Sequence, residues 1–523
     1  MTRQQTTTDD TVTYLGIDVG TSATKAVIIA SDGTVLARSR VTHPAARGVG
    51  PGRADAAAWR SSVTAAVREL APHTATVRGI GLDTHCPTAL LLDAVGEPLT
   101  AGITWDHPGL AHPTEQLIAA LDPAERRLAG NHLKPATAMG AAYRLFHTLD
   151  PEAASRAATF GFVGTWLGQW LTGQRAIDPT QASYTGLLAS TDGSCRWLEG
   201  ALQRLGIPLA QLPPVRPSLS VLGPLLPSAA TTLGLPQGIQ VMVGSGDTPA
   251  ASYALGAEPG GRPLLIMGTT HVVSNSLDAP DYRARALQRV DVRAGRWLIN
   301  GVINGGDALA DGAERLGYGR GDLAVAALVG TAFKAEPADM DSAPVFIPHT
   351  RPERGPLWFA EPRTAVLGAI QDTSAPSAAR GIVEGVLFAD RMIIESCIGE
   401  QQRTLYVSGA FGVDPELPQL LADSLDRDIL VVDESHLPAI GAAAMCSEVL
   451  GEQVIPPPAA RRVTPRAEWR ATVSRRWQEF RLAWSDVTAT APLITLDEAS
   501  ATSPHATIPA PAGPLPRTLT RSI

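Results

Sequence analysis

Lysine is nearly missing from this chain of 523 residues, where Lys25, Lys134 and Lys334 are the only lysines among 43 basic residues. The formal net charge of −8 leaves no broad basic surface, which argues against nucleic acid as a main partner. A local cationic pocket for phosphate is still compatible with this charge.

Cysteine and long apolar runs are also scarce. The four cysteines are widely scattered and form no CxxC pair, which excludes a zinc-finger or disulfide framework and favours a reducing cytoplasm. No apolar run is long enough to span a bilayer, and the polar start MTRQQTTTDDTVT has no signal-peptide core. We therefore expect a cytoplasmic protein without a membrane partner.

Two common nucleotide-binding signatures are absent. The sequence contains no GxxxxGK[ST] loop, and the segment GIGLDT lacks the third glycine of a dinucleotide fingerprint. Neither P-loop nor Rossmann chemistry is therefore indicated.

The length and the pattern of the chain predict two α/β domains. A chain this long exceeds the size at which one hydrophobic core stops growing, and 44% of its residues are hydrophobic. Apolar strands interleave with helices, and the pattern starts again near Val241. We expect a disordered N-terminus at 1–12, domains at 13–257 and 258–490, and a disordered tail at 491–523.

The local pattern also predicts individual elements. Strands are expected at 14–20, 24–30, 34–41, 77–84 and 89–99, and helices at 59–70, 151–173, 248–257 and 468–484. The proline-rich stretch 212–227 is expected to be a loop. GIDVGTS and LIMGTTHVV share one design, a strand entering a Gly-Thr-hydroxyl turn, which predicts a degenerate duplication.

These two turns could cradle phosphate. Asp18 ends an apolar strand and is followed by Gly20, Thr21 and Ser22, so amides and hydroxyls converge beside a carboxylate suited to a hydrated metal. A plain hairpin turn is the alternative for either segment alone. Two such turns facing each other could clamp the outer phosphates of a nucleotide from opposite sides.

The segment GSGDTPAA supplies a candidate base. Small residues let the backbone approach a ligand, and the carboxylate of Asp247 could accept a proton from an attacking hydroxyl. Alternatively, Asp247 is the N-cap of a helix from Thr248 to Leu255.

Five segments occur in the order found in the FGGY carbohydrate kinases, and each resembles that family's motif. They are IDVGTSATKAVI, VGSGDTPAASYALG, LLIMGTTHVVS, EGVLFADR and VSGAFGVDPELPQLLADSLDRDI. The resemblance covers roughly residues 14–450. It implies an α/β fold of two ribonuclease-H-like (actin-like ATPase) domains with an interdomain cleft, the sugar bound mainly by the first domain and MgATP between the two.

The resemblance also implies roles for individual residues. Asp247 becomes the general base, Asp18 the organiser of Mg²⁺, and Lys25 the basic residue after the first turn. The ATP contacts implied are Gly20, Thr21, Ser22, Lys25, Gly268, Thr269, Thr270, Gly305, Gly409 and Ala410. In the last of these segments SGAFG replaces the family's glycine-rich run, so Phe411 could stack on or narrow the nucleotide pocket.

For the sugar, TWDHPG resembles the family's Trp-Asp segment, which implies that Trp105 and Asp106 lie in the substrate pocket together with Asp247. Core packing for Trp105 and a turn for Asp106 are the alternatives. Asp83, Thr84 and His85 in LDTHCPTALLLD stand where xylulose kinases have a different, Gln-Met-His-like segment, and they resemble more closely the Asp-x-x-Cys segment of ribulose kinases. Ser183 and Tyr184 in DPTQASYTGLLA are further candidates, and Glu353 with Arg354 is expected to form a structural ion pair.

The function that follows is transfer of the γ-phosphate of MgATP to a hydroxyl of a small sugar. A pentulose such as ribulose or xylulose is the first expectation, with a related ketose, a polyol or a sugar acid such as gluconate left open. The alternatives are a catalytically weak nucleotide-dependent sugar sensor and an actin-fold enzyme that transfers another group. Related kinases are often dimers, so a homodimer is one expected form.

Overall fold

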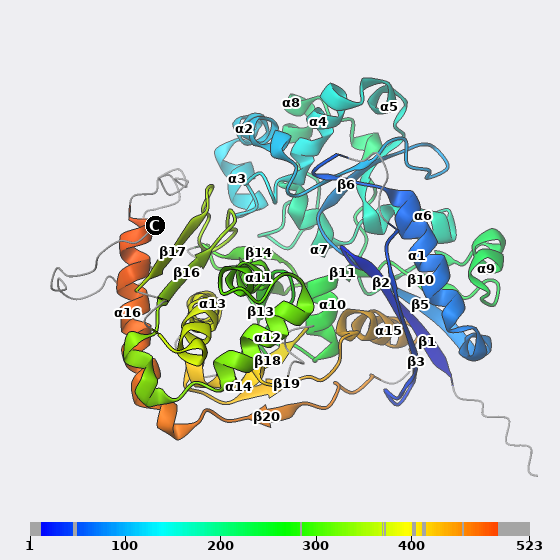
Figure 1. The fold of residues 1–523 in the computed structure, drawn as a ribbon. Helices are drawn as coiled ribbons and strands as arrows, with labels where there is room; N and C mark the ends of the chain where they lie inside the picture. Colours follow the sequence, from blue (N-terminus) through cyan, green and yellow to red (C-terminus); the bar gives the residue numbers. More distant parts are fainter. Residues whose placement is uncertain are drawn as a thin grey trace, which may run out of the picture.

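Two sheets, each covered by its own helices, organise the molecule (Figure 1). The computed structural model describes residues 12–44, 50–282, 285–368, 370, 373–399, 404–409, 415–451 and 454–489. Within these ranges, no helix is both long and apolar enough to cross a membrane. The four cysteines are free thiols.

The first half of the chain builds a seven-stranded sheet with the order β3-β2-β1-β5-β10-β9, and β11 also pairs with β5. Its strands are β1 (Thr13–Val19), β2 (Ala23–Ala30), β3 (Val35–Thr42), β5 (Val77–Thr84), β9 (Val221–Pro224), β10 (Gln240–Met242) and β11 (Ser245–Gly246). Every residue of β1 is buried. A strand covered on both faces needs no polar alternation, which explains the continuous apolar sequence YLGI.

The second half builds another seven-stranded sheet with the order β14-β15-β13-β12-β18-β19-β20. Its strands are β12 (Leu264–Met267), β13 (His271–Leu277), β14 (Leu287–Val290), β15 (Trp297–Ile303), β18 (Leu405–Ser408), β19 (Ile429–Val431) and β20 (Arg461–Val463). A separate hairpin joins β16 (Val345–His349) and β17 (Arg363–Leu367).

The two sheets have the same topology. In the first, β1 is antiparallel to β2 and parallel to β5, and β5 is parallel to β10. In the second, β12 is antiparallel to β13 and parallel to β18, and β18 is parallel to β19. The outer pairs β2–β3 and β13–β15 are antiparallel in both, as are β9–β10 and β19–β20. The core β3-β2-β1-β5-β10 is thus repeated as β15-β13-β12-β18-β19, in agreement with the predicted duplication, while β11 is additional in the first sheet and β14 in the second.

Helices cover both faces of each sheet. The outer face of the first sheet packs against α1 (Ala56–Glu69), α6 (Val163–Thr172) and α9 (Pro227–Leu233). On the second sheet the outer helices are α11 (Gly305–Arg315), α12 (Asp322–Phe333), α13 (Ala375–Ile398), α14 (Leu417–Leu425) and α16 (Arg470–Thr488). Two helices, α10 (Asp247–Ala254) and α15 (Leu437–Val449), share one core with both sheets and lie between them (Figure 1).

A mainly helical unit is inserted in the first half. A four-stranded sheet, β4 (Arg53–Ala54), β7 (Gly102–Thr104), β6 (Thr88–Leu92) and β8 (Thr159–Phe162), supports it. Its helices are α2 (Ala111–Ala120), α3 (Pro123–Ala129), α4 (Ala142–Leu149), α5 (Pro151–Arg156), α7 (Pro179–Ala182) and α8 (Glu199–Leu205). Its core includes Leu287, Val302 and Trp358, so this unit packs directly against the second half.

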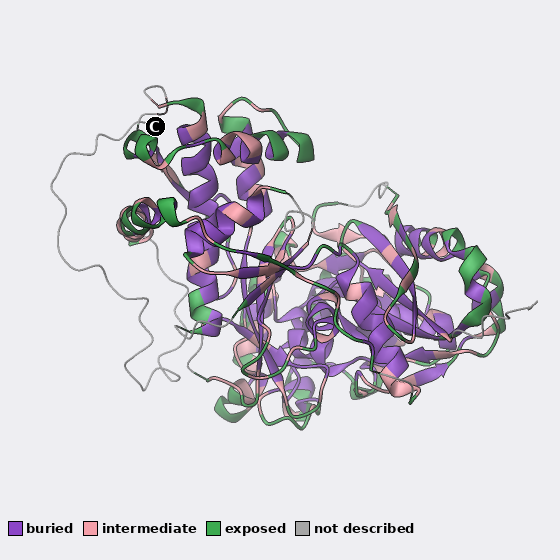
Figure 2. Ribbon diagram, turned by 90° about the horizontal axis from the view of Figure 1, so that it is seen from below, coloured by how far each residue is buried: buried purple, intermediate pink, exposed green. Residues whose placement is uncertain are grey.

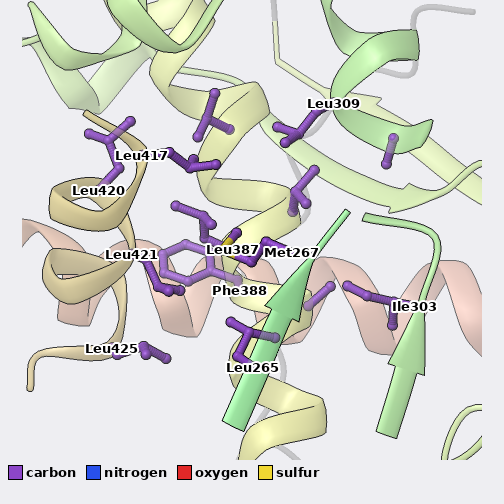
Figure 3. Close-up of a cluster of buried hydrophobic side chains, with 14 of the residues drawn as sticks. Leu265, Met267, Ile303, Leu309, Leu387, Phe388, Leu417, Leu420, Leu421 and Leu425 are labelled. Carbon is purple, nitrogen blue, oxygen red and sulfur yellow. The ribbon is translucent and has the colours of Figure 1, made fainter. Parts of the chain in front are cut away.

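The helix α13 is the centre of the second core. It begins where the hydroxyl of Ser374 accepts the amide N–H of Ser377, and a proline in the first turn leaves no amide to satisfy there. Its buried side chains Leu387 and Phe388 meet leucines of α14 and residues of β12 (Figure 3). Full burial of each such side chain contributes about 1.5–3 kcal/mol. In Figure 2 the buried residues, in purple, lie in the interior and the exposed ones, in green, lie mostly at the periphery.

Two of the predicted elements are wrong in part. The stretch 151–173 was expected to be one helix, but β8 separates α5 from α6 because its Thr-Phe-Gly-Phe segment pairs with β6. The stretch 212–227 was expected to be a loop, but it contains the strand β9, which pairs with β10 at the edge of the first sheet. In both places a neighbouring strand decides the structure rather than local propensity.

Candidate functional site

Three carboxylates meet where β1, β5 and α10 come together. Asp18 and Asp83 lie opposite each other near the carboxyl ends of the parallel strands β1 and β5. β11 pairs with β5 at Asp83 and Thr84, and α10 starts directly afterwards with Asp247. The sheet topology thus brings together residues that are far apart in the sequence.

Asp18 and Asp83 have different pKa values, although both carboxyl groups are buried. Asp83 is 0% exposed, and burial together with the charges of Asp18 and Asp247 raises its pKa well above the ordinary value. Burial raises the pKa of Asp18 to about 6, while Lys25 opposes the rise. The interaction between the two groups raises the pKa of Asp83 and lowers that of Asp18, so Asp83 holds the proton and Asp18 carries the charge.

The two Gly-Thr turns present their hydroxyls outward. In the first, the Gly20 amide donates to the carbonyl of Ala23 at 3.0 Å, and Thr21 and Ser22 are exposed. In the second, the Gly268 amide donates to the carbonyl of Thr270 at 3.1 Å, and Thr269 is exposed while Thr270 is half-buried. The hydrogen bond that closes the turn thus reaches the third residue after Gly20 but the second residue after Gly268.

Lys25 stands beside Asp18. The two residues are partners across the β1–β2 hairpin, and the Lys25 ammonium donates to the carbonyl of Ser435 at 2.8 Å. Ser435 belongs to the segment before α15, so the lysine ties the first turn to an element of the second half. Its charge also acts on both carboxyl groups, Asp18 and Asp83.

Polar side chains not recognised in the sequence support the first turn. One ring nitrogen of His43, Nε2, lies 2.9 Å from the carbonyl of Gly20, and the other, Nδ1, lies 2.8 Å from the hydroxyl of Ser62. Thr24 reaches the same hydroxyl at 2.8 Å. Burial lowers the pKa of His43, so the neutral ring donates through Nε2 to the turn.

The second turn is fixed by a buried pair. His271 Nδ1 lies 2.9 Å from both carboxylate oxygens of Asp390 on α13. Gly305, at the start of α11, packs directly on the His271 ring, where a Cβ atom would collide. The Asp307 amide donates to the carbonyl of Thr269 at 3.2 Å. Gly305 is thus held beside the second turn by packing.

The predicted nucleotide turn is described only at its first residue. Gly409 follows β18 with φ of 103°, and an added Cβ would collide with the backbone of Met267, so only glycine fits there. Ala410 and Phe411 lie outside the described residues.

Asp247 opens α10 with one free carboxylate oxygen. The N-cap is Gly246, without a side-chain bond, so the alternative role of Asp247 as the cap does not apply. Its Oδ1 accepts the Thr248 amide at 2.6 Å and the Thr248 hydroxyl at 3.3 Å. The second oxygen accepts no hydrogen bond from the described residues. A half-buried carboxylate held by one oxygen can accept a proton on the other.

The residues predicted to bind the sugar lie at different depths. Thr84 donates to Gln181 at 3.1 Å, and His85 uses Nδ1 on the carbonyl of Val19 and Nε2 on Thr88. The side chains of Thr84 and His85 are buried and hydrogen-bonded, which makes them supports of the site wall, whereas the carboxyl oxygens of Asp83 are buried without a hydrogen-bond partner among the described residues. Burial lowers the pKa of His85, so the ring is neutral.

The Trp-Asp segment lies nearer the surface. Trp105 is half-buried with its ring 6.4 Å from that of His85, edge to face. Asp106 is exposed and accepts the hydroxyl of Thr104. A role of these two residues in sugar binding stays a prediction.

A second set of supports comes from the short helix α7. Asp178 caps it and accepts the hydroxyl of Thr180 at 2.5 Å and the amide side chain of Gln181 at 2.7 Å. Thr180 in turn accepts the Gly246 amide at 3.0 Å. The Asp-Pro-Thr sequence is a recognisable helix start, but its contact with Gly246 is long-range and could not be read from the sequence.

The expected ion pair between Glu353 and Arg354 is wrong. Glu353 accepts hydrogen bonds from the amide and the side chain of Asn304 and lies 3.1 Å from His349 Nδ1. Arg354 forms no salt bridge with Glu353 but lies within electrostatic reach of it and of Tyr184, Asp106 and Asp247. Ser183 also departs from its predicted role, because its hydroxyl donates to Pro179 and accepts the amide of Val290.

The carboxylates fit a magnesium ion shared with a nucleotide. The described residues contain no group of three or more His, Cys, Asp or Glu side chains that could hold a metal alone. Mg²⁺ typically takes one or two carboxylates and completes its shell with water and phosphate. Asp18 suits this role, since its buried Oδ1 has no hydrogen-bond donor among the described residues and lies beside Gly20 of the first turn.

Comparison with known proteins places the chain in one family. The model of the FGGY family of carbohydrate kinases matches with its N-terminal domain at residues 13–254 and its C-terminal domain at 259–447. An apulose kinase from Pectobacterium atrosepticum is 26% identical over 90% of this chain and 98% of its own. A xylulose kinase from Klebsiella pneumoniae is 27% identical over 83% of this chain and 89% of its own. The crystal structure of a xyloylose kinase from Brucella ovis has the same fold, with a TM-score of 0.80 and 23% identity over 91% of this chain and 99% of that one.

Proposed function

The chain belongs to the FGGY family of carbohydrate kinases and is an ATP-dependent sugar kinase with the actin-like fold, and from this premise we propose how its residues perform the transfer. ATP lies between the two Gly-Thr turns, with its outer phosphates against Gly20, Thr21 and Ser22 on one side and Gly268, Thr269 and Thr270 on the other. Gly305 and Gly409 approach the nucleoside end.

The transfer step uses Asp247 as base. The acceptor hydroxyl attacks the γ-phosphorus, the bond between that phosphorus and the β–γ bridging oxygen breaks, and ADP leaves with the electron pair. The hydroxyl proton passes to the unpartnered oxygen of Asp247. Phosphoryl transfer depends mainly on positioning and charge neutralisation, so the fixed placement of the two turns matters as much as the base.

Asp18 and Lys25 supply the charges beside the phosphates. Bound Mg²⁺ would supply positive charge that neutralises the outer phosphates. Asp18 would hold that ion through its water shell. Lys25 keeps Asp18 ionised and has donors left for a phosphate oxygen after its bond to Ser435.

One observation carries this proposal: the free oxygen of Asp247 lies within electrostatic reach of Asp18, whose hairpin carries the first phosphate turn. A sugar sensor would not need a carboxylate kept free at this point. The test is ADP release by the purified protein with MgATP and a panel of acceptors. The acceptor is a small polyhydroxylated molecule, and we place the reaction in the cytoplasm, where ATP is supplied.

The Asp18→Asn variant should need about tenfold more Mg²⁺ for half-maximal turnover. An amide cannot supply the negative charge that holds the hydrated ion, and loss of such a supporting group typically weakens metal affinity 10–100-fold. A Mg²⁺ titration of ADP release measures the shift, with the exposed Asp192→Asn as control. An unchanged Mg²⁺ midpoint would remove Asp18 from this role.

A further inference from the structure

Arg289 of the second half reaches into the acceptor side of the site. It lies on β14, and its guanidinium is 5.1 Å from the ring centre of Tyr184 in the first half. Its Nη1 lies 3.3 Å from the place where a Cβ of Gly246 would be, directly beside Asp247. β14 is the extra strand of the second sheet, so this arginine has no counterpart in the duplicated half.

This guanidinium is buried without a direct ion pair. Arg289 is 3% exposed, its Nε has no hydrogen-bond partner among the described residues, and it forms no salt bridge with any of them. Asp291 lies within electrostatic reach, but its carboxylate accepts the hydroxyl of Ser276 and the amide of Val292. A buried charge without a direct partner is costly, so it is retained where a ligand completes it.

A second guanidinium faces the same space. Arg354 is half-buried, forms no salt bridge with a described residue, and lies within electrostatic reach of Tyr184, Glu353, Asp106 and Asp247. Burial lowers the pKa of Arg354 and outweighs the opposite effect of these neighbours. The two arginines therefore border the space between the Trp-Asp segment and Asp247, on the acceptor side.

We propose, on the basis of the kinase function above, that the acceptor is a sugar acid whose carboxylate is bound by Arg289 and Arg354. A planar guanidinium matches a carboxylate through parallel hydrogen bonds, whereas a neutral ketose or polyol would leave the buried charge uncompensated. Because both arginines come from the second half, acid binding also joins the two halves around the acceptor.

The test compares acceptors that differ only at one carbon. Aldonates and alditols of equal length, such as ribonate with ribitol and gluconate with glucitol, are assayed by ADP release beside ribulose and xylulose. We expect one aldonate to exceed its alditol and both ketoses at least about tenfold in kcat/KM, the range of a hydrogen bond to a charged group.

The variants Arg289→Gln and Arg354→Gln test whether these two residues cause the preference for the aldonate. Each should raise the KM for the aldonate about tenfold and leave the alditol nearly unchanged. Arg293→Gln is the matched control, because it removes a charge from the same hairpin where Arg293 pairs with Glu448 at 2.8 Å. If Arg289→Gln fails to fold, the KM of the Arg354→Gln variant for the aldonate still tests the proposal, because Arg354 is only half-buried.

Three results would overturn the inference. Preference for a ketose or an alditol would refute the binding of an acceptor carboxylate by the two arginines. The proposed kinase function would still stand. Equal losses for all acceptors in both arginine variants would give the arginines a structural role. Absence of ADP release with every acceptor would refute the kinase function and this inference together.

Discussion

Asp247→Asn should lower turnover by at least about two orders of magnitude while ATP binding is retained, in line with the size of general-base catalysis. The asparagine has nearly the same shape and still accepts the Thr248 amide through its oxygen, so α10 keeps its start. It cannot take the hydroxyl proton. Steady-state ADP release measures turnover, and nucleotide binding is measured separately by calorimetry.

A matched control separates the base from the helix start. Asp322 is the first residue of α12, also after a glycine N-cap without a side-chain bond, and it is exposed. Both aspartates lie near the positive end of a helix dipole, so Asp322→Asn removes the same small dipole contribution. Its turnover should stay normal. Near-normal turnover in Asp247→Asn would contradict the assignment of the base.

Glu384→Gln should lower the free energy of unfolding of the second half by about 3–5 kcal/mol, the usual cost of removing one partner of a buried ion pair. The carboxylate of Glu384 is fully buried and accepts Arg380 Nε at 2.9 Å and Arg476 Nε at 2.5 Å. Arg476 belongs to α16, so this network holds the last described helix to α13. The variant removes the closest partner of two buried guanidiniums, which keep only longer contacts, Arg380 with Asp423 at 3.7 Å and Arg476 with Glu479 at 3.8 Å.

The control lies on the same helix. Arg391 and Glu395 form an i,i+4 pair like that of Arg380 and Glu384, but both side chains are partly exposed. An exposed helical pair contributes about 0.3–0.5 kcal/mol, so Glu395→Gln should change little. Urea unfolding followed by tryptophan fluorescence compares the two. Equal effects would show that the buried network adds no special stability.

The Glu384 network also predicts a pH dependence. Burial alone would raise the pKa of Glu384, but Arg476 and Arg380 outweigh it, and its pKa lies below the ordinary value. A lowered pKa gives stability that is complete above the unfolded-state pKa of about 4.3 and is lost as the pH falls through the folded-state pKa. The difference between the wild type and Glu384→Gln should therefore shrink in acid.

Short-range signals in the sequence predict much of the fold. The strand-turn-strand units around Gly20 and Gly268 are local, and so their repetition could be recognised before the matching sheets were known. The boundary errors at 151–173 and 212–227 have one cause, because β8 and β9 are strands by virtue of distant partners. Local propensity contains no information on those partners.

The site could be predicted only where its residues stand next to a recognisable turn. Asp18 and Asp247 follow or precede such signals, whereas Arg289 lies in an ordinary-looking strand with nothing in its neighbours to mark it. His85 is the opposite case. The sequence suggested a ligand contact for it, but its two ring nitrogens lie against the carbonyl of Val19 and the hydroxyl of Thr88. Burial and partner choice are set by tertiary packing, which one sequence does not reveal.

The most direct test of the account is acceptor-dependent ADP release by the purified wild-type protein with MgATP. The account predicts that at least one small sugar, polyol or sugar acid raises ADP release far above the rate with ATP alone, and that Asp247→Asn abolishes this increase. ADP release that stays at the ATP-only rate with every acceptor, although ATP binds, would contradict it.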